Sequence, residues 1–194
     1  SYALALRPDG KLLASGGYLS SNAEQEWGNI RIYDFQSGEL LQILKGHEDA
    51  VADLAFSPDG RWLASASHDD NVRLWKRSGS RFTAGPVLYG HEKDVYGVKL
   101  FESSGRLRVV SASDDYTIRL WDAESGRQLA LGRHKNMADS LAVGPNWIAS
   151  AGYDKTIRIW NPKTGREERK ILGQLGPGPE GMIYAIALSP DGKL

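Results

Sequence analysis

Three sets of histidine, serine and aspartate side chains recur along this chain at similar spacings, and each set ends in a tryptophan. A histidine that accepts a serine proton while an aspartate orients its ring is the arrangement that activates serine for acyl transfer. The three sets are His47, Ser65, Asp69 and Trp75; His91, Ser111, Asp115 and Trp121; and His134, Ser150, Asp154 and Trp160. The residue types alone therefore permit nucleophilic catalysis, and the chain offers it three times.

The threefold repetition favours a structural role over a catalytic one. An enzyme domain needs one triad, whereas a repeating unit carries a structural device in every copy. A carboxylate in a tight, buried turn is costly unless several donors meet it, and an imidazole with turn amides can supply them. A buried indole N–H also needs an acceptor. We therefore interpret the twelve residues as structural groups and predict no catalytic residue and no enzymatic activity.

Metal and cofactor chemistry find no support in the residue pattern. The three histidines of the sets fall in separate repeats, too far apart to share one metal ion. The chain has no cysteine, which removes disulfides, thiolate ligands and cysteine catalysis. A Gly- and Pro-rich stretch at 176–181 lacks the lysine that follows a phosphate-binding loop and is interpreted as a connection. We predict neither a cofactor nor a metal site.

Composition and charge indicate which classes of partner the chain is suited to bind. The 194 residues include 24 Lys plus Arg and 24 Asp plus Glu, so no net field attracts nucleic acid or an acidic membrane. No apolar run approaches the ~20 residues of a membrane helix, and the first residues lack a signal-peptide pattern. We expect a protein or peptide partner, with no nucleic acid and no membrane. The absence of cysteine fits a reducing, cytoplasmic location.

The elements that position these residues are short strands in a repeating unit. The unit is plainest at residues 51–75, where two apolar runs flank the turn Ser57-Pro58-Asp59-Gly60 and a third run ends at Trp75. Short runs rich in β-branched and aromatic residues, bounded by turn residues, are typical of antiparallel strands. The closing aromatics of successive units are Tyr33, Trp75, Trp121 and Trp160, at intervals of 42, 46 and 39 residues. Such a period predicts one four-stranded propeller blade per interval.

Over essentially the whole chain the units resemble WD repeats. The Gly-His dipeptide of that family occurs as Gly46-His47 and Gly90-His91, and the Trp-Asp ending as Trp121-Asp122. Departures from the pattern are Arg133-His134, Tyr33-Asp34, Trp75-Lys76 and Trp160-Asn161. The resemblance implies that each set is a hydrogen-bonded tetrad, in which Asp bonds His, His bonds Ser and Ser reaches the Trp indole.

The predicted fold is all-β, with four WD-type blades of four antiparallel strands plus the first strand of a fifth. The predicted blades are 1–45, 46–89, 90–132 and 133–175, and residues 176–194 begin the fifth. Segments 2–12 and 184–194 agree at all but two positions, Leu4/Ile186 and Arg7/Ser189. WD propellers close with about seven blades, so we expect part of a larger ring. A homo-oligomer that completes an eight-bladed ring stays open as the second arrangement, although the duplicated segments would then compete for one position.

The resemblance also places partner contacts on one face, called the top face, formed by the start of each inner strand and the residue before each tetrad Asp. The strand-start positions are Tyr2, Ala52, Tyr96, Asp139 and Tyr184, and the positions before Asp are His68, Asp114 and Tyr153. Four tyrosines among eight positions favour protein binding, because tyrosine combines large contact area with a polar tip. The alternative is that these side chains only shield the ends of the inner strands.

Blade 1 departs from the pattern. Ser15 and Tyr33 are 18 residues apart, whereas Ser65 and Trp75 are 10 apart, so an insertion at 18–27 enlarges the loop before the third strand. Trp27 then occupies the tetrad Asp position. We expect a protruding loop, a weaker local clip and Trp27 as a candidate partner-binding residue, with a Trp folded over its own blade as the alternative.

Two functions remain after these exclusions. The first is a non-enzymatic scaffold that binds a protein or peptide through the top face. The alternative is a regulatory or sensor propeller segment of a larger multidomain signalling enzyme. The residues leave both open, because they identify the architecture and not the partner.

Overall fold

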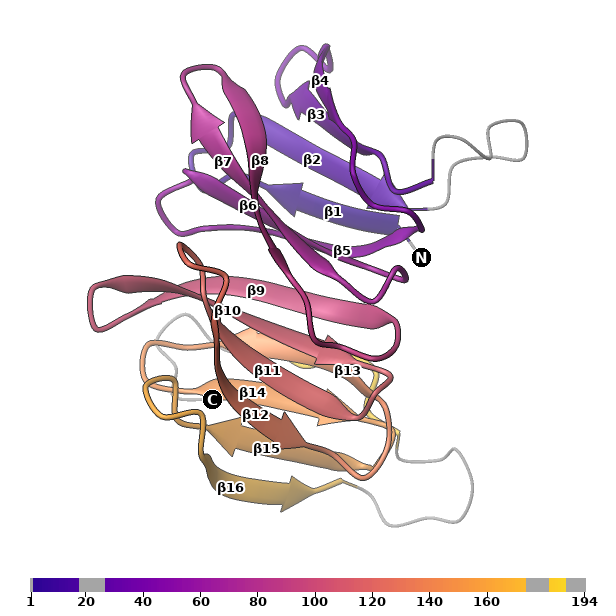
Figure 1. Cartoon of the computed structure of the whole chain (residues 1–194), viewed down its shortest axis with the longest axis vertical. Coiled ribbons are helices and arrows are strands. Elements are labelled where there is room, and N and C mark those ends of the chain that lie inside the picture. Colours follow the sequence, from indigo (N-terminus) through magenta and orange to yellow (C-terminus); the bar gives the residue numbers. More distant parts are fainter. Residues whose placement is uncertain (1, 18–26, 174–181, 188–194) are drawn as a thin grey trace.

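The computed structural model describes residues 2–17, 27–173 and 182–187. Those residues form strands joined by turns and loops, and none of their segments is a helix long and apolar enough to cross a membrane. The strands form four separate four-stranded antiparallel sheets, each built from strands consecutive in sequence. Figure 1 shows the sheets following one another in chain order, as blades of an arc. The all-β prediction with four WD-type blades is therefore confirmed.

Each blade runs from an inner strand to an outer one. Blade 1 comprises β1 (Tyr2–Leu6), β2 (Leu12–Gly17), β3 (Ile30–Asp34) and β4 (Leu40–Leu44). Blade 2 comprises β5 (Val51–Phe56), β6 (Trp62–Ser67), β7 (Val72–Ser78) and β8 (Arg81–Leu88). Blade 3 comprises β9 (Val95–Ser103), β10 (Arg106–Ser113), β11 (Thr117–Asp122) and β12 (Gln128–Arg133). Blade 4 comprises β13 (Ala138–Val143), β14 (Ile148–Gly152), β15 (Thr156–Trp160) and β16 (Glu167–Leu172).

The first turn of each blade follows from its residue types. In blade 2 the Gly60 N–H bonds the Ser57 carbonyl at 2.8 Å, and Gly60 adopts a φ of 67° that suits glycine. The Ser57 hydroxyl accepts the Trp62 N–H at 2.9 Å and so satisfies the start of β6. Pro58 presets the φ of the second position. This turn fixes the register of β5 against β6.

The turn that carries the tetrad aspartate contains a left-handed residue in every blade. This residue lies five positions before the closing aromatic and is Gly28, Asp70, Tyr116 or Lys155, with φ between 61° and 79°. It directly follows Asp69, Asp115 and Asp154 in blades 2 to 4, and Trp27 in blade 1. Blade 1 therefore keeps the turn geometry of the other blades at 27–28, although it lacks their carboxylate.

The blades pack face to face in sequence order. Inner strands β1, β5, β9 and β13 are neighbours in turn. The closing tryptophan of each of blades 2 to 4 lies in an apolar cluster shared with the preceding blade: Trp75 with Ile32, Trp121 with Leu74, and Trp160 with Leu120. One face of blades 2 to 4 thus carries the tetrad side chains and is covered by the blade before it.

The expected first strand of a fifth blade is not formed in the part of 176–194 that the structure describes. Residues 182–187 carry no strand, although they lie against blade 4 through a bond from the Ile186 N–H to Ser140 Oγ of 3.0 Å. The matching segment β1 is a strand because it pairs with β2. Residues 188–194, which follow this segment in the sequence, lie outside the described residues.

Candidate functional site

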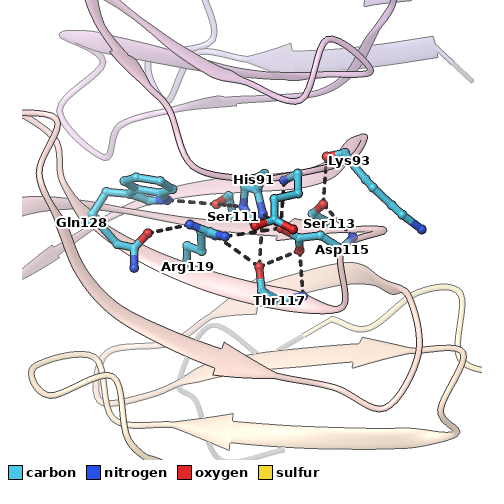
Figure 2. Close-up of polar contacts among 10 residues, drawn as sticks. His91, Lys93, Ser111, Ser113, Asp115, Thr117, Arg119 and Gln128 are labelled. Carbon is cyan, nitrogen blue, oxygen red and sulfur yellow. Dashed lines mark hydrogen bonds and ion pairs between the residues drawn. The ribbon is translucent and has the colours of Figure 1, made fainter.

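The tetrad of blade 3 is a linear chain of hydrogen bonds buried between two blades (Figure 2). His91 Nδ1 lies 2.9 Å from Asp115 Oδ2, and His91 Nε2 lies 2.7 Å from Ser111 Oγ. The indole N–H of Trp121 donates to the same Ser111 oxygen at 2.9 Å. His91 precedes β9, Ser111 lies in β10, and Trp121 lies in β11. Asp115 lies in the turn between β10 and β11, so the fold brings together residues up to 30 positions apart in the sequence.

The donors and acceptors of this chain have one consistent assignment. A carboxylate only accepts, so His91 Nδ1 carries the proton that Asp115 accepts. Burial lowers the pKa of His91, and Asp115 opposes that shift in part, so the ring is neutral and its Nε2 accepts the Ser111 proton. The Ser111 oxygen then accepts the Trp121 N–H. Every polar atom that joins the tetrad is satisfied.

The carboxylate end of the tetrad is held ionised. Burial raises the pKa of Asp115, but hydrogen bonds from His91 and Thr117 outweigh it, and the net pKa lies well below its usual range. The Glu92 N–H also donates to Asp115 Oδ2, at 3.2 Å. An ionised aspartate that accepts several donors ties the segment before β9 to the turn before β11.

The other two tetrads repeat this geometry. The Nδ1 to carboxylate distances are 2.8 Å in blade 2 and 3.0 Å in blade 4, and both Nε2 to Oγ distances are 2.7 Å. The indole donates at 3.0 Å and 2.8 Å. The residues are His47, Ser65, Asp69 and Trp75 in blade 2, and His134, Ser150, Asp154 and Trp160 in blade 4. All twelve predicted residues thus come together in three sets of four.

A threonine and an arginine join the tetrad in each of blades 3 and 4, and none of these four residues was among the predicted tetrad residues. Thr117 and Thr156 each donate a hydroxyl to the tetrad carboxylate at 2.6 Å. Arg119 and Arg158 approach the same carboxylates at 3.5 Å and 3.3 Å. Figure 2 shows Arg119 between Gln128 and Thr117. Their constant distance from the tetrad Asp could have identified them in the sequence, because the Thr comes two residues and the Arg four residues after it. In blade 2, Asn71 takes the place of the Thr.

The tetrad serines are placed where a substrate cannot reach them. Ser65, Ser111 and Ser150 have no exposed surface, and each hydroxyl oxygen already accepts an indole N–H. A nucleophilic serine needs open space beside its oxygen and donors for an oxyanion. The described residues also contain no cluster of three or more His, Asp or Glu that could hold a metal ion. The tetrads are therefore suited to joining strands.

Two aromatic pairs link successive blades at the top face. The rings of His68 and Tyr96 lie 5.2 Å apart at 61°, and those of Tyr153 and Tyr184 lie 5.2 Å apart at 71°. In each pair the first residue precedes a tetrad Asp. The second lies at the start of the next repeat: Tyr96 is the second residue of β9, and Tyr184 occupies the matching position in 182–187. Edge-to-face contacts of this kind stabilise aromatic pairs beyond simple burial. The predicted positions are thus neighbours across blade boundaries.

Between the two pairs the equivalent positions are acidic. Asp114 precedes the tetrad Asp of blade 3, and Asp139 follows the first residue of β13. Burial raises the pKa of Tyr96 to about 12, and the charges of Asp94, Asp114 and Asp139 add to this shift. Burial also raises the pKa of Asp139. Asp94, whose carboxylate lies 3.3 Å from the Tyr96 hydroxyl, was not among the predicted residues.

We call His68, Tyr96, Asp114, Asp139, Tyr153 and Tyr184 the top-face row. Tyr184 is 58% exposed, and the side chains of the others are partly buried. Two of the remaining predicted positions lie in inner strands outside this row: Ala52 lies in β5, and Tyr2 is the first residue of β1. Trp27 is 41% exposed, while residues 18–26 of the predicted insertion lie outside the described residues.

The sheets and tetrads define a class, the four-stranded blades of a WD-type β-propeller. The family model described as WD domain, G-beta repeat matches residues 38–76, 83–122 and 137–161, which together make up just over half of the chain. The chain belongs to this family. The resemblance predicted from the Gly-His and Trp-Asp dipeptides is confirmed.

The curated relatives that the chain matches are longer than the chain itself. The chain is 32% identical over 125 residues to Protein tipD of Dictyostelium discoideum, covering 64% of the chain and 18% of the relative. It is 32% identical over 151 residues to Nuclear distribution protein PAC1-2 of Uncinocarpus reesii, covering 69% of the chain and 32% of the relative. Nuclear distribution protein nudF of Aspergillus oryzae is 38% identical over 99 residues, covering 50% and 21%. The chain spans about a third or less of the length of these relatives.

Proposed function

We propose that this chain is a non-enzymatic interaction scaffold that binds a protein or peptide segment through its top-face row. The observation that carries the proposal is the recurrence of the interblade aromatic pair, His68 with Tyr96 and Tyr153 with Tyr184, on the edge where loops meet. A rigid scaffold that presents aromatic side chains on adjoining loops is suited to recognition.

The charge pattern supports a polypeptide partner. The whole chain has no net charge, so no long-range field selects a polyanion such as nucleic acid. The row itself is acidic at Asp114 and Asp139, which disfavours phosphate groups further. A tyrosine hydroxyl can donate a hydrogen bond to a carbonyl of an extended peptide and can accept one from a peptide N–H. A neighbouring carboxylate can accept from a peptide N–H as well.

The non-enzymatic part of the proposal is supported by the serines of the three tetrads. Their hydroxyls lie inside the interblade contacts with no exposed surface. Membership in the WD-repeat family and the similarity to nuclear distribution proteins agree with a scaffold. That the chain is a regulatory segment of a larger signalling enzyme stays a prediction. Its cytoplasmic location also stays a prediction.

A peptide selection tests the proposal without knowledge of the natural partner. A displayed library of random peptides is selected on the immobilised chain, and the retained peptides are measured by titration against Tyr96→Ala and Phe35→Ala. Phe35 is a matched control because it is 54% exposed in the turn between β3 and β4, at the opposite edge of its blade.

The expected result is a loss of at least about tenfold in affinity for Tyr96→Ala, the cost of removing an aromatic contact residue. Phe35→Ala should bind as the unmodified chain does. Retained peptides that bind Tyr96→Ala normally but fail on Phe35→Ala would place recognition at the other edge and contradict the proposal. So would a library that yields no specific binder.

A further inference from the structure

The first turn of blade 1 carries an arginine where the matching turn of blade 2 carries a serine. Arg7 stands at the start of the turn between β1 and β2, and its counterpart between β5 and β6 is Ser57. The turn itself is of the same kind, because the Gly10 N–H bonds the Arg7 carbonyl at 2.8 Å. The arginine side chain is therefore not needed for the geometry of the turn.

The side chain of Arg7 reaches from blade 1 to blade 2 and is largely buried. Arg7 is 7% exposed, and a Cβ placed on Gly60 of blade 2 would lie 3.0 Å from Arg7 Cγ. Nε donates to Asp9 Oδ1 at 2.8 Å, and Nη2 donates to Asp9 Oδ2. Nη1 is buried and has no hydrogen-bond partner among the residues that the structure describes. A buried donor without an acceptor is unfavourable, so this guanidinium can still take one further anionic partner.

An open pocket of about 330 Å³ lies beside Arg7, between the first turns of blades 1 and 2. Arg7 and Asp9 line it from blade 1, Asp59 and Gly60 line it from blade 2, and Arg77 near the end of β7 completes the lining. The Arg77 side chain is exposed and forms no hydrogen bond or ion pair with the described part of the chain. The pocket thus holds two arginines with donors to spare.

Both carboxylates that line the pocket are already bonded within their own turns. Hydrogen bonds from Arg7 lower the pKa of the Asp9 carboxyl well below its usual range, so this group is ionised and paired. Asp59 accepts the Ser57 hydroxyl at 2.5 Å. Within the described residues, Arg7 Nη1 and the Arg77 guanidinium are therefore the groups of this pocket that remain to meet an anion.

Further exposed cations lie on the same edge of blade 2. Its first turn, at 57–61, and its hairpin turn, at 76–81, are joined by the bond from the Arg77 N–H to the Arg61 carbonyl at 2.8 Å. The two segments contain one carboxylate and four exposed cations, which are Arg61, Lys76, Arg77 and Arg81. The matching segments of blade 3, at 103–107 and 122–127, contain two arginines and two carboxylates. The excess of positive charge is therefore particular to blade 2 and does not follow from the repeat.

We propose that the pocket between the first turns of blades 1 and 2 binds a carboxylate side chain of an acidic peptide segment, held by Arg7 Nη1 and the Arg77 guanidinium. Planar guanidinium groups match the geometry of a carboxylate, and hydrogen bonds between charged groups are the strong ones. A phosphate group carries nearly twice the charge of a carboxylate, and Asp9 and Asp59 beside the pocket repel it more. The cations at 61, 76 and 81 attract the acidic neighbours of the bound side chain.

This pocket and the top-face row lie on opposite edges of the blades. The strands of each sheet are antiparallel and consecutive, so the turns after the first and third strands lie at the other end from the turn that carries the tetrad aspartate. The two surfaces also differ in charge, because the top-face row contains Asp114 and Asp139. The inference thus goes beyond the proposed function, and either surface can fail its test without the other.

Fluorescence anisotropy on the full chain tests the pocket with a labelled oligoglutamate peptide whose ends are blocked. Arg77→Gln removes an exposed cation of the pocket and should raise the Kd by at least about tenfold, as expected for a hydrogen bond between charged groups. Arg7→Ser introduces the residue that begins the blade 2 turn and should have an effect of the same size. Arg127→Gln is the matched control, because it removes one exposed cation between β11 and β12, on the same edge but outside the pocket. Its Kd should be nearly that of the unmodified chain.

Circular dichroism shows that each variant is folded, and the remaining outcomes decide the proposal. It is overturned if the unmodified chain does not bind oligoglutamate, if Arg7→Ser leaves the Kd unchanged, or if Arg77→Gln and Arg127→Gln lose equally, which would indicate attraction to surface charge in general. A peptide with phosphoserine in place of glutamate should bind more weakly, and tighter binding would make this a phosphate site instead. Tyr96→Ala should bind oligoglutamate normally, and a loss there would place the acidic peptide on the top face.

Discussion

The indole N–H of Trp121 points at Ser111 Oγ, 2.9 Å away, and thereby fixes the direction of the entire tetrad. With the oxygen accepting from the indole, the serine proton is left for His91 Nε2, 2.7 Å away. The same atoms would form a catalytic triad if the serine faced open space. Here the tryptophan closes that space, and a motif with catalytic residue types becomes a joint between strands.

Trp121→Phe tests the contribution of the indole donor. The phenyl ring keeps most of the apolar contact, but Ser111 loses a buried donor, so the free energy of unfolding should fall by about 1 kcal/mol or more. Urea denaturation measures it. Trp147→Phe is the control, because the Trp147 indole donates no hydrogen bond to the described residues. Equal losses at the two positions would mean that ring size, not the hydrogen bond, matters.

Stability should fall as the pH is lowered from 7 to 5. Burial lowers the pKa of His91 and of His134, with partial opposition from Asp115 and Asp154. In the unfolded chain these histidines keep their usual pKa of about 6.5. Below that pH the unfolded state binds protons that the folded state does not, so the folded state loses stability. Thermal unfolding at a series of pH values measures this.

The tetrad carboxylates act in a different pH range. Hydrogen bonds overcome burial and lower the pKa of Asp69, Asp115 and Asp154, so their contribution is present above pH 4 and lost only below it. Between pH 7 and 5 the histidines therefore dominate. His91→Gln combined with His134→Gln should flatten the slope in this window, whatever its effect on stability at pH 7. A slope that persists unchanged would assign the linkage to other groups.

Blade 1 should open more readily than blade 3. Trp27 occupies its tetrad Asp position and Tyr33 replaces the closing tryptophan, so this tetrad cannot form. Loss of a buried hydrogen-bonded group of this kind corresponds to about tenfold or more in local opening. Amide hydrogen exchange should be faster in β2 than in β10. Strands β6 and β14 are internal controls that should resemble β10, and equal protection in all four would contradict the prediction.

The architecture could be predicted from the sequence because characteristic residues mark the ends of the strands in each repeat. Gly60 and its counterpart Gly10 mark the hairpin after the inner strand, and the closing aromatics mark the third strand. The tetrad residues could be selected because three copies occur in phase. A single Ser, His and Asp set would have left catalysis and structure undecided, since the residue types are the same.

Features that depend on neighbouring blades could not be predicted from one unit. The sequence offered His68 and Tyr96 as separate top-face positions, but their ring contact exists only because blade 3 lies beside blade 2. Asp94 has no repeating signature and gains its role from the Tyr96 hydroxyl. Residues 182–187 have the sequence of a strand, yet a strand requires a paired neighbour. Among the described residues, their backbone N–H groups donate only to Ser140 and Gly152.

The most direct test of the account compares two substitutions in blade 3 by thermal and urea unfolding. The buried tetrads hold the strands together, whereas we propose that the top-face row is available to a partner. His91→Ala leaves Asp115 and Ser111 without their partner and should cost ~1 to 3 kcal/mol, whereas Tyr96→Ala should change stability by less than about 1 kcal/mol. An unchanged midpoint for His91→Ala together with a large loss for Tyr96→Ala would contradict it.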